Sequence, residues 1–109
     1  MKKLVHEAFI VKNNEIVATA PTIAGYYGYY TGHKSNKFSL SYNVRESVEF
    51  PTDDMILANL EHTLDPEYIP LWNLIQELLL NQDKGFDEAV EELMTRKVTS
   101  PGYVIVGGL

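Results

Sequence analysis

The sequence predicts an α+β fold in which helices pack on a mostly antiparallel sheet. Three observations lead to this prediction. Residues 4–45 are rich in β-favouring side chains, residues 52–96 carry apolar side chains at helical spacing, and residues 103–108 return to a β-favouring run. With 109 residues, 45% of them apolar, and no internal linker, the chain is expected to form a single domain or part of one.

The N-terminal part predicts a β-hairpin. Leu4 to Lys12 and Ile16 to Ile23 are two strand-like runs, and the turn residues Asn13, Asn14 and Glu15 separate them. Turn residues between two apolar runs favour antiparallel pairing of those runs. The sequence therefore predicts that the first two strands are neighbours in the sheet.

A tyrosine-rich segment follows, and Gly25, Gly28 and Gly32 punctuate it. Because glycine adopts backbone conformations that other residues avoid, this segment is expected to form a second hairpin with bulges. A polar turn is expected over His33 to Lys37. After this turn, Phe38 to Arg45 alternates apolar and polar residues, which predicts a strand with one buried face.

The second half of the chain predicts three helices and a final strand. Thr52 or Asp53 can cap the first helix, because their side chains accept hydrogen bonds from free backbone N–H groups. Helical spacing of apolar residues then marks each helix, and a run of valine and isoleucine predicts a buried strand entering a glycine turn. The expected ranges are Asp54–Thr63, Pro70–Leu80, Phe86–Arg96 and Tyr103–Gly108.

Composition excludes several classes of function. The net charge of −6 argues against nucleic-acid binding, which needs clustered Lys and Arg, and no apolar run approaches the ~18 residues of a membrane-spanning helix. His6, His33 and His62 lack metal-ligand spacing, so no metal site is expected, and no motif calls for a cofactor. Met1 to Glu7 does not have the apolar stretch of a signal peptide, and the compartment stays undetermined.

Two motifs resemble a known family. The segment A-G-Y-Y-G-Y-Y-T-G-H-K spans Ala24 to Lys34, and F-S-L-S-Y-N-V-R spans Phe38 to Arg45. Together with the closing run Pro101 to Gly108, they resemble the central part of the catalytic subunit in the acid ceramidase and N-acylethanolamine acid amidase family. This family consists of N-terminal-nucleophile hydrolases that cleave the amide bond of lipid N-acyl amides. The resemblance implies that the chain forms half or less of an αββα sandwich.

The resemblance also implies which residues lie beside a substrate. Asn43 and Arg45 match strand positions next to the family's active site, and the family's glutamate between them is replaced here by Val44. Glu46 is a candidate replacement for that carboxylate. Tyr26 and Tyr27 are expected to be substrate-adjacent, where the tyrosine run either walls an acyl pocket or packs within the sheet.

The family's catalytic groups are not found in this chain. Its members attack with a cysteine at the start of the catalytic subunit and stabilise the oxyanion with an asparagine, whereas this chain has no cysteine and no match to that asparagine. No residue here is therefore assigned a catalytic role. Two hypotheses follow: the chain is a fragment or truncated relative of a lipid amide hydrolase, or it is a non-catalytic module that binds a ligand or a protein.

Partners are expected under both hypotheses. An incomplete sheet leaves an open strand edge, which the remaining segments of the hydrolase or another copy of the chain would cover. An N-acyl lipid is a possible ligand. The resemblance implies a lysosomal location for animal members of the family, and this chain offers no signal that would place it there.

Overall fold

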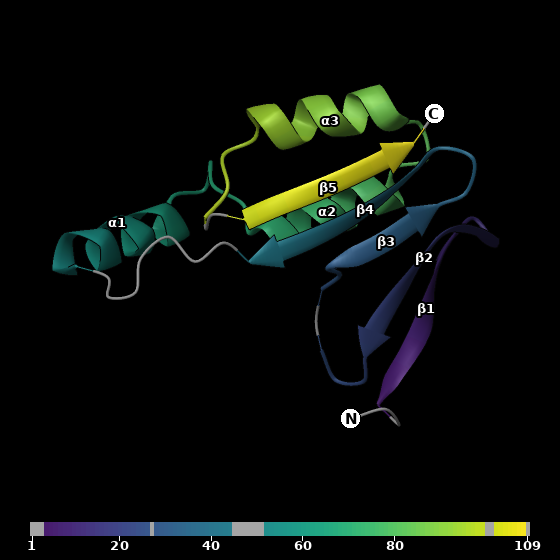
Figure 1. Cartoon of the computed structure of the whole chain (residues 1–109), viewed down its shortest axis with the longest axis horizontal. Helices are drawn as coiled ribbons and strands as arrows, with labels where there is room; N and C mark the ends of the chain where they lie inside the picture. The colour runs from purple at the N-terminus through teal and green to yellow at the C-terminus, as the bar shows by residue number, and fades with distance from the viewer. Residues whose placement is uncertain (1–3, 27, 45–51, 100–101, 109) are drawn as a thin grey trace.

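A computed structural model of the chain describes residues 4–26, 28–44, 52–99 and 102–108. Within these residues five strands form one antiparallel sheet, in which the spatial order β1-β2-β3-β4-β5 follows the chain (Figure 1). The strands are β1 (Val5–Lys12), β2 (Glu15–Ile23), β3 (Thr31–Lys34), β4 (Phe38–Val44) and β5 (Gly102–Gly108). The helices are α1 (Asp53–Leu64), α2 (Leu71–Leu80) and α3 (Phe86–Thr95). The predicted α+β class is confirmed.

The first hairpin forms where the sequence predicted it. Strands β1 and β2 pair antiparallel from Val5 opposite Ile23 to the turn, and Asn13 and Asn14 have φ values of 53° and 65°. Two consecutive residues with positive φ form the type of tight turn that matches the twist of the flanking strands. The register shifts between Ile10 and Val11, so the first hairpin contains a bulge or a similar irregularity.

The second hairpin lies later than predicted. Its turn surrounds Asn36, and β3 and β4 pair on either side of it, so His33 and Lys34 belong to a strand instead of a turn. The tyrosine-rich segment before β3 is a connecting loop. Gly28 has a φ of 112°, and a Cβ there would lie 2.9 Å from the Trp72 ring, so this loop is pressed against the helical layer.

The core lies between the sheet and α2. Its largest fully buried side chains are all on this helix, and they pack against the inward residues of the strands. Leu79 lies over Gly32, where a Cβ would come within 2.5 Å of a Leu79 methyl group. These helix residues are Leu74, Ile75, Leu78 and Leu79, which confirms the helical spacing of apolar residues predicted for this range.

The other two helices contact the sheet less. Ala89 of α3 is fully buried, and this helix lies beside β5. Thr52 caps α1 as predicted, because its side chain accepts a hydrogen bond from the Met55 N–H. No residue of α1 is buried, and the helix projects away from the sheet (Figure 1).

The prediction that the last strand is buried is wrong for one of its faces. Tyr103 and Ile105 are 56% and 65% exposed, because β5 is an edge strand and the helices cover the opposite side of the sheet. We call the side without helices the open face. None of the helices within the described ranges is long and apolar enough to cross a membrane.

Candidate functional site

Three tyrosine rings form a row at one end of the sheet. Tyr26 and Tyr30 lie 5.5 Å apart between ring centroids, and Tyr30 stacks on Tyr42 at 5.4 Å. The hydroxyl groups of Tyr26 and Tyr30 are hydrogen-bonded to each other. This hydrogen bond is the largest cause, and burial the second, of a pKa for Tyr30 that is raised above its ordinary value. The Tyr30 hydroxyl therefore keeps its proton at neutral pH.

An apolar depression adjoins this row. It has a volume of about 350 Å³, and we call it the tyrosine hollow. A volume of this size falls in the range of small-molecule pockets, and apolar walls with a few polar atoms at the rim suit a hydrocarbon chain. The hollow is lined by Val5, Pro21, Thr22, Ile23, Tyr26, Gly28 and Tyr30.

The predicted site residues fall partly within the described structure. Tyr26 lines the tyrosine hollow with a half-exposed ring, and Asn43 is exposed on β4 opposite Tyr103. The stacked rings of Tyr30 and Tyr42 link the loop of Tyr26 to the strand residue next to Asn43. Tyr27, Arg45 and Glu46 lie outside the described residues, so their predicted places stay predictions.

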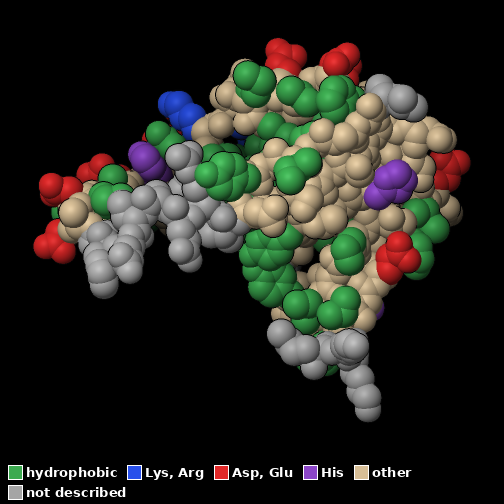
Figure 2. Space-filling view, in the orientation of Figure 1, with side chains coloured by type: hydrophobic (Ala, Val, Ile, Leu, Met, Phe, Trp, Pro, Cys, Tyr) green, Lys and Arg blue, Asp and Glu red, His purple; other side chains and the backbone are tan. Residues whose placement is uncertain are grey.

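The open face has a polar middle. One row of directly opposite residues crosses all five strands, and it consists of Phe9, Thr19, His33, Ser39 and Gly107. A second depression of about 430 Å³ covers part of this row, and Pro21 lines both it and the tyrosine hollow. Figure 2 looks onto this side of the sheet, where hydrophobic side chains lie around a stretch of backbone and other side chains. The two depressions therefore adjoin at Pro21.

The hydroxyl groups of this surface are bonded in ways that do not activate them. Ser39 Oγ donates to the Gly107 carbonyl oxygen at 3.4 Å, and Thr31 Oγ1 and Ser41 Oγ are 3.3 Å apart. Nucleophilic attack by a hydroxyl group needs a base within hydrogen-bond reach. The hydrogen bonds of the described open-face residues show no such pair, and this part of the chain holds no group of three metal-ligating side chains.

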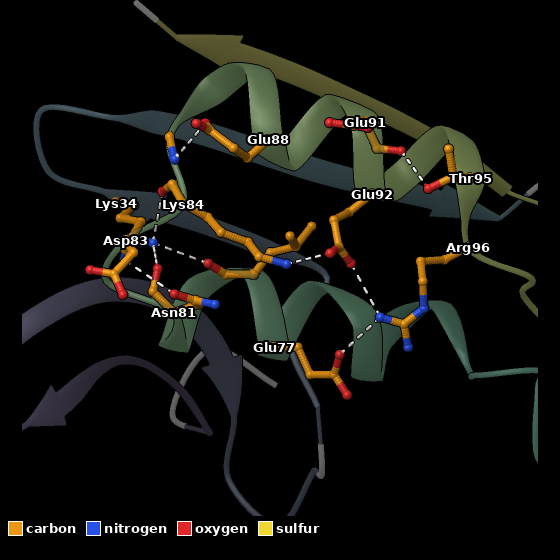
Figure 3. Close-up of polar contacts among 12 residues, drawn as sticks. Lys34, Glu77, Asn81, Asp83, Lys84, Glu88, Glu91, Glu92, Thr95 and Arg96 are labelled. Atoms are coloured by element: carbon orange, nitrogen blue, oxygen red, sulfur yellow. Dashed lines mark hydrogen bonds and ion pairs between the residues drawn. The ribbon is translucent and has the colours of Figure 1, made fainter.

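Sequence reasoning missed Lys34, which lies on the opposite side of the sheet from the open face. Its side chain is only 2% exposed, and its Nζ donates to the carbonyl oxygens of Leu78 at 3.2 Å, Lys84 at 3.1 Å and Asn81 (Figure 3). Lys37 Nζ donates in the same way to Gln82. Burial lowers the pKa of Lys34 to about 8.

The role of Lys34 is structural. The last carbonyl groups of a helix have no partner within the helix, and a lysine ammonium both satisfies them and complements the helix dipole. The inward direction of Lys34 could have been read from strand alternation, since Gly32 and Phe38 also point inward. Its charge instead favoured the prediction of a turn.

Comparisons with known proteins agree on one group of relatives. The rat N-acylethanolamine-hydrolyzing acid amidase is 32% identical over 108 residues, which are 99% of this chain and 28% of the rat protein. Human acid ceramidase is 32% identical over 97 residues, which are 89% of this chain and 24% of the human protein. No protein-family model matches the chain.

A solved structure supports the same relationship. The Caenorhabditis elegans N-acylethanolamine-hydrolyzing acid amidase ortholog superposes with a TM-score of 0.80 and 30% sequence identity. The match covers 98% of this chain and 43% of the nematode chain. This chain thus spans about a quarter of the length of the two mammalian relatives.

Proposed function

Because the chain belongs to the acid ceramidase and N-acylethanolamine acid amidase family, we propose that it forms the helix-covered sheet of a hydrolase that cleaves lipid N-acyl amides. In this proposal the chain does not attack the amide itself. It supplies one wall of the substrate site, and a further polypeptide segment supplies the nucleophile.

The tyrosine hollow is the observation that carries the proposal. Its walls are apolar, and burying one CH₂ group of an acyl chain is worth about 0.8 kcal/mol. The Tyr26 and Tyr30 hydroxyl groups give it a polar rim, which suits a ligand with a hydrocarbon tail and an amide head. The ring row leads from this hollow toward the end of β4, where Asn43 lies. An acyl chain in the hollow would therefore direct its amide toward the strand that the family uses beside its active site.

The missing chemistry defines what the other segment must provide. Amide cleavage in this family type needs a thiolate, an amine that takes its proton, and donors for the oxyanion, and this chain has no cysteine. Loss of one oxyanion donor alone costs about 10²-fold or more in rate. The bare open face offers the place where a second sheet would pack to complete an αββα sandwich.

Intact-mass measurement of every polypeptide that co-purifies with the chain under native conditions tests this proposal first. The expected result is a second polypeptide that begins with cysteine, together with hydrolysis of an N-acylethanolamine or a ceramide. Ile23→Asp places a charge in the hollow and should raise the KM, whereas Leu60→Asp on the exposed side of α1 should not.

The alternative function is a non-catalytic binding module. It is supported by the same hollow together with the absence of a cysteine. A single species of 12.4 kDa that binds a fatty N-acylethanolamine without hydrolysing it, and loses this binding in Ile23→Asp, would establish the module and exclude the hydrolase.

A further inference from the structure

Tyr26 and Tyr30 meet at their hydroxyl groups. One hydroxyl donates a hydrogen bond to the other, and the ring centroids lie 5.5 Å apart with an angle of 40° between the ring planes. The raised pKa of Tyr30 keeps its proton in place at neutral pH, so the hydroxyl contact persists there. The contact lies between two residues of one loop and therefore needs no neighbouring polypeptide.

Two phenols in this arrangement are well placed for oxidative coupling. Removal of one electron and one proton from a tyrosine gives a phenoxyl radical, whose unpaired electron is shared by the oxygen and by the ring carbons ortho and para to it. The para carbon of tyrosine carries the rest of the side chain, so two such radicals join through their ortho carbons. Each ortho carbon is only two bonds from the hydroxyl oxygen. Hydroxyl groups in contact therefore bring the ortho carbons of Tyr26 and Tyr30 close together.

The surroundings of the pair favour the same reaction. Tyr30 also stacks on Tyr42, with ring centroids 5.4 Å apart and 27° between the planes. An electron can pass between rings at these distances, so an oxidant that reaches any of the three tyrosines can oxidise the pair. The chain has no cysteine, whose thiolate is the usual first target of oxidants. No thiol therefore competes with the tyrosine row for a one-electron oxidant.

We propose that Tyr26 and Tyr30 form a site of oxidative modification, at which a haem peroxidase with hydrogen peroxide creates a dityrosine bond within the chain. Each tyrosine gives up one electron and one proton, a bond forms between two ortho carbons, and the two ring C–H bonds at these carbons break. One hydrogen peroxide accepts the two electrons and two protons and becomes two water molecules. The inference does not depend on hydrolase activity.

The crosslink would act on the tyrosine hollow. Tyr26 and Tyr30 both line the hollow, and Gly28 between them lies against Trp72. A covalent bond between the two rings closes this loop on itself, so the rings can no longer separate at the rim. The modification would therefore fix the rim in the arrangement that the structure shows.

Peptide mass spectrometry of the full chain, after treatment with a haem peroxidase and hydrogen peroxide at neutral pH, tests the site. Trypsin cuts after lysine and arginine, so residues 13–34 form one peptide that contains Tyr26 and Tyr30, while Tyr42 lies in the peptide of residues 38–45. A bond between Tyr26 and Tyr30 leaves one peptide that has lost two hydrogen atoms, whereas a bond between Tyr30 and Tyr42 joins two peptides. The first product is expected, with a yield that does not change with protein concentration, because the reaction is intramolecular.

Three controls accompany this measurement. Tyr26→Phe and Tyr30→Phe each remove one partner of the contact, so the crosslink within residues 13–34 should fall by at least about tenfold. Tyr29→Phe is the matched variant, because Tyr29 is adjacent to Tyr30 in the sequence but packs against the core, and the crosslink should be unchanged. The natural chain unfolded in concentrated urea gives a control that needs no folded variant, and there the crosslinks should spread over the seven tyrosines.

Several results would overturn the inference. Dityrosine found mainly between residues 13–34 and 38–45, or between separate chains, would show that the hydroxyl contact does not direct the coupling. A crosslink within residues 13–34 that survives Tyr30→Phe would assign the reaction to other tyrosines of this peptide. The same distribution of crosslinks in the folded chain and in urea would show that distance along the sequence, and not the fold, selects the pair.

Discussion

The buried Lys34 makes the free energy of unfolding rise with pH. A lysine that gains a partner on folding usually has the opposite effect. Burial lowers the folded-state pKa of Lys34 from 10.5 to about 8. Between these two values the unfolded chain binds more protons than the folded chain, so the free energy of unfolding rises with pH. This fall in pKa raises the free energy of unfolding by about 3 kcal/mol as the pH passes through both pKa values. About 1.5 kcal/mol of that rise occurs between pH 8 and pH 9.5.

Lys34→Met isolates this contribution. Methionine keeps most of the apolar stem but has no ammonium group, so the variant should lack the rise in stability that Lys34 causes. Near pH 7 two effects oppose each other: three carbonyl groups lose a donor at roughly 1 kcal/mol each, and the cost of burying a charge disappears. The slope against pH, and not the value at one pH, is therefore the informative quantity.

The assay is urea unfolding of both proteins at several pH values from 7 to 9.5. The two proteins share every other titratable group, so the contributions of those groups to the pH dependence cancel in the difference. The expected result is a difference in unfolding free energy that grows in favour of the natural chain by about 1.5 kcal/mol between pH 8 and pH 9.5. Parallel curves, or a difference that moves the other way, would show that the three carbonyl groups hold the ammonium charged throughout this range.

Three further predictions concern packing and the tyrosine row. Leu79→Ala should lower the free energy of unfolding by about 2 to 5 kcal/mol in urea titration, because the side chain is fully buried and leaves a cavity. Gly32→Ala should lower the free energy of unfolding by about 1 to 3 kcal/mol, because the new Cβ would lie 2.5 Å from a Leu79 methyl group. Gly107→Ala is the control: its Cβ would have its nearest neighbour at 3.8 Å, so the free energy of unfolding should change by less than about 1 kcal/mol. Tyr26→Phe removes the hydrogen bond that most raises the pKa of Tyr30, so ultraviolet titration should show Tyr30 ionising at lower pH; an unchanged titration would contradict the hydroxyl contact.

The parts of the fold that sequence predicted are those where local pattern and tertiary position agree. Asn13 and Asn14 favour a tight turn and form one, and the apolar spacing from Leu71 to Leu80 predicts a buried stripe that α2 presents to the sheet. The failures come from long-range placement. Ile105 looks like a core residue by type, but the helices cover the other side of its strand, so it is exposed.

The candidate site was predictable to a smaller extent. The tyrosine run indicated that Tyr26 lies in a candidate binding segment. Its contact with Tyr30, and the contact of Tyr30 with Tyr42, join a loop to a strand, and the spacing of residues in the sequence does not predict such contacts. The outward direction of Asn43 did follow from alternation along β4. The hollow beside the row depends on Val5 and Ile23, which pair across the first hairpin, and only the folded register places them there.

The matched motif explains why family membership and catalysis are separable in this chain. In the run from Ala24 to Lys34, Gly28 admits the Trp72 ring, Gly32 admits Leu79, and Lys34 closes the end of α2. Each of these contacts joins the sheet to the helical layer, and Gly28 also lines the tyrosine hollow. The resemblance thus rests largely on residues that build the scaffold. A chain that keeps these residues keeps the scaffold contacts whether position 44 holds valine or the family's glutamate. Activity therefore has to be tested with the missing nucleophile supplied and cannot be inferred from the motif.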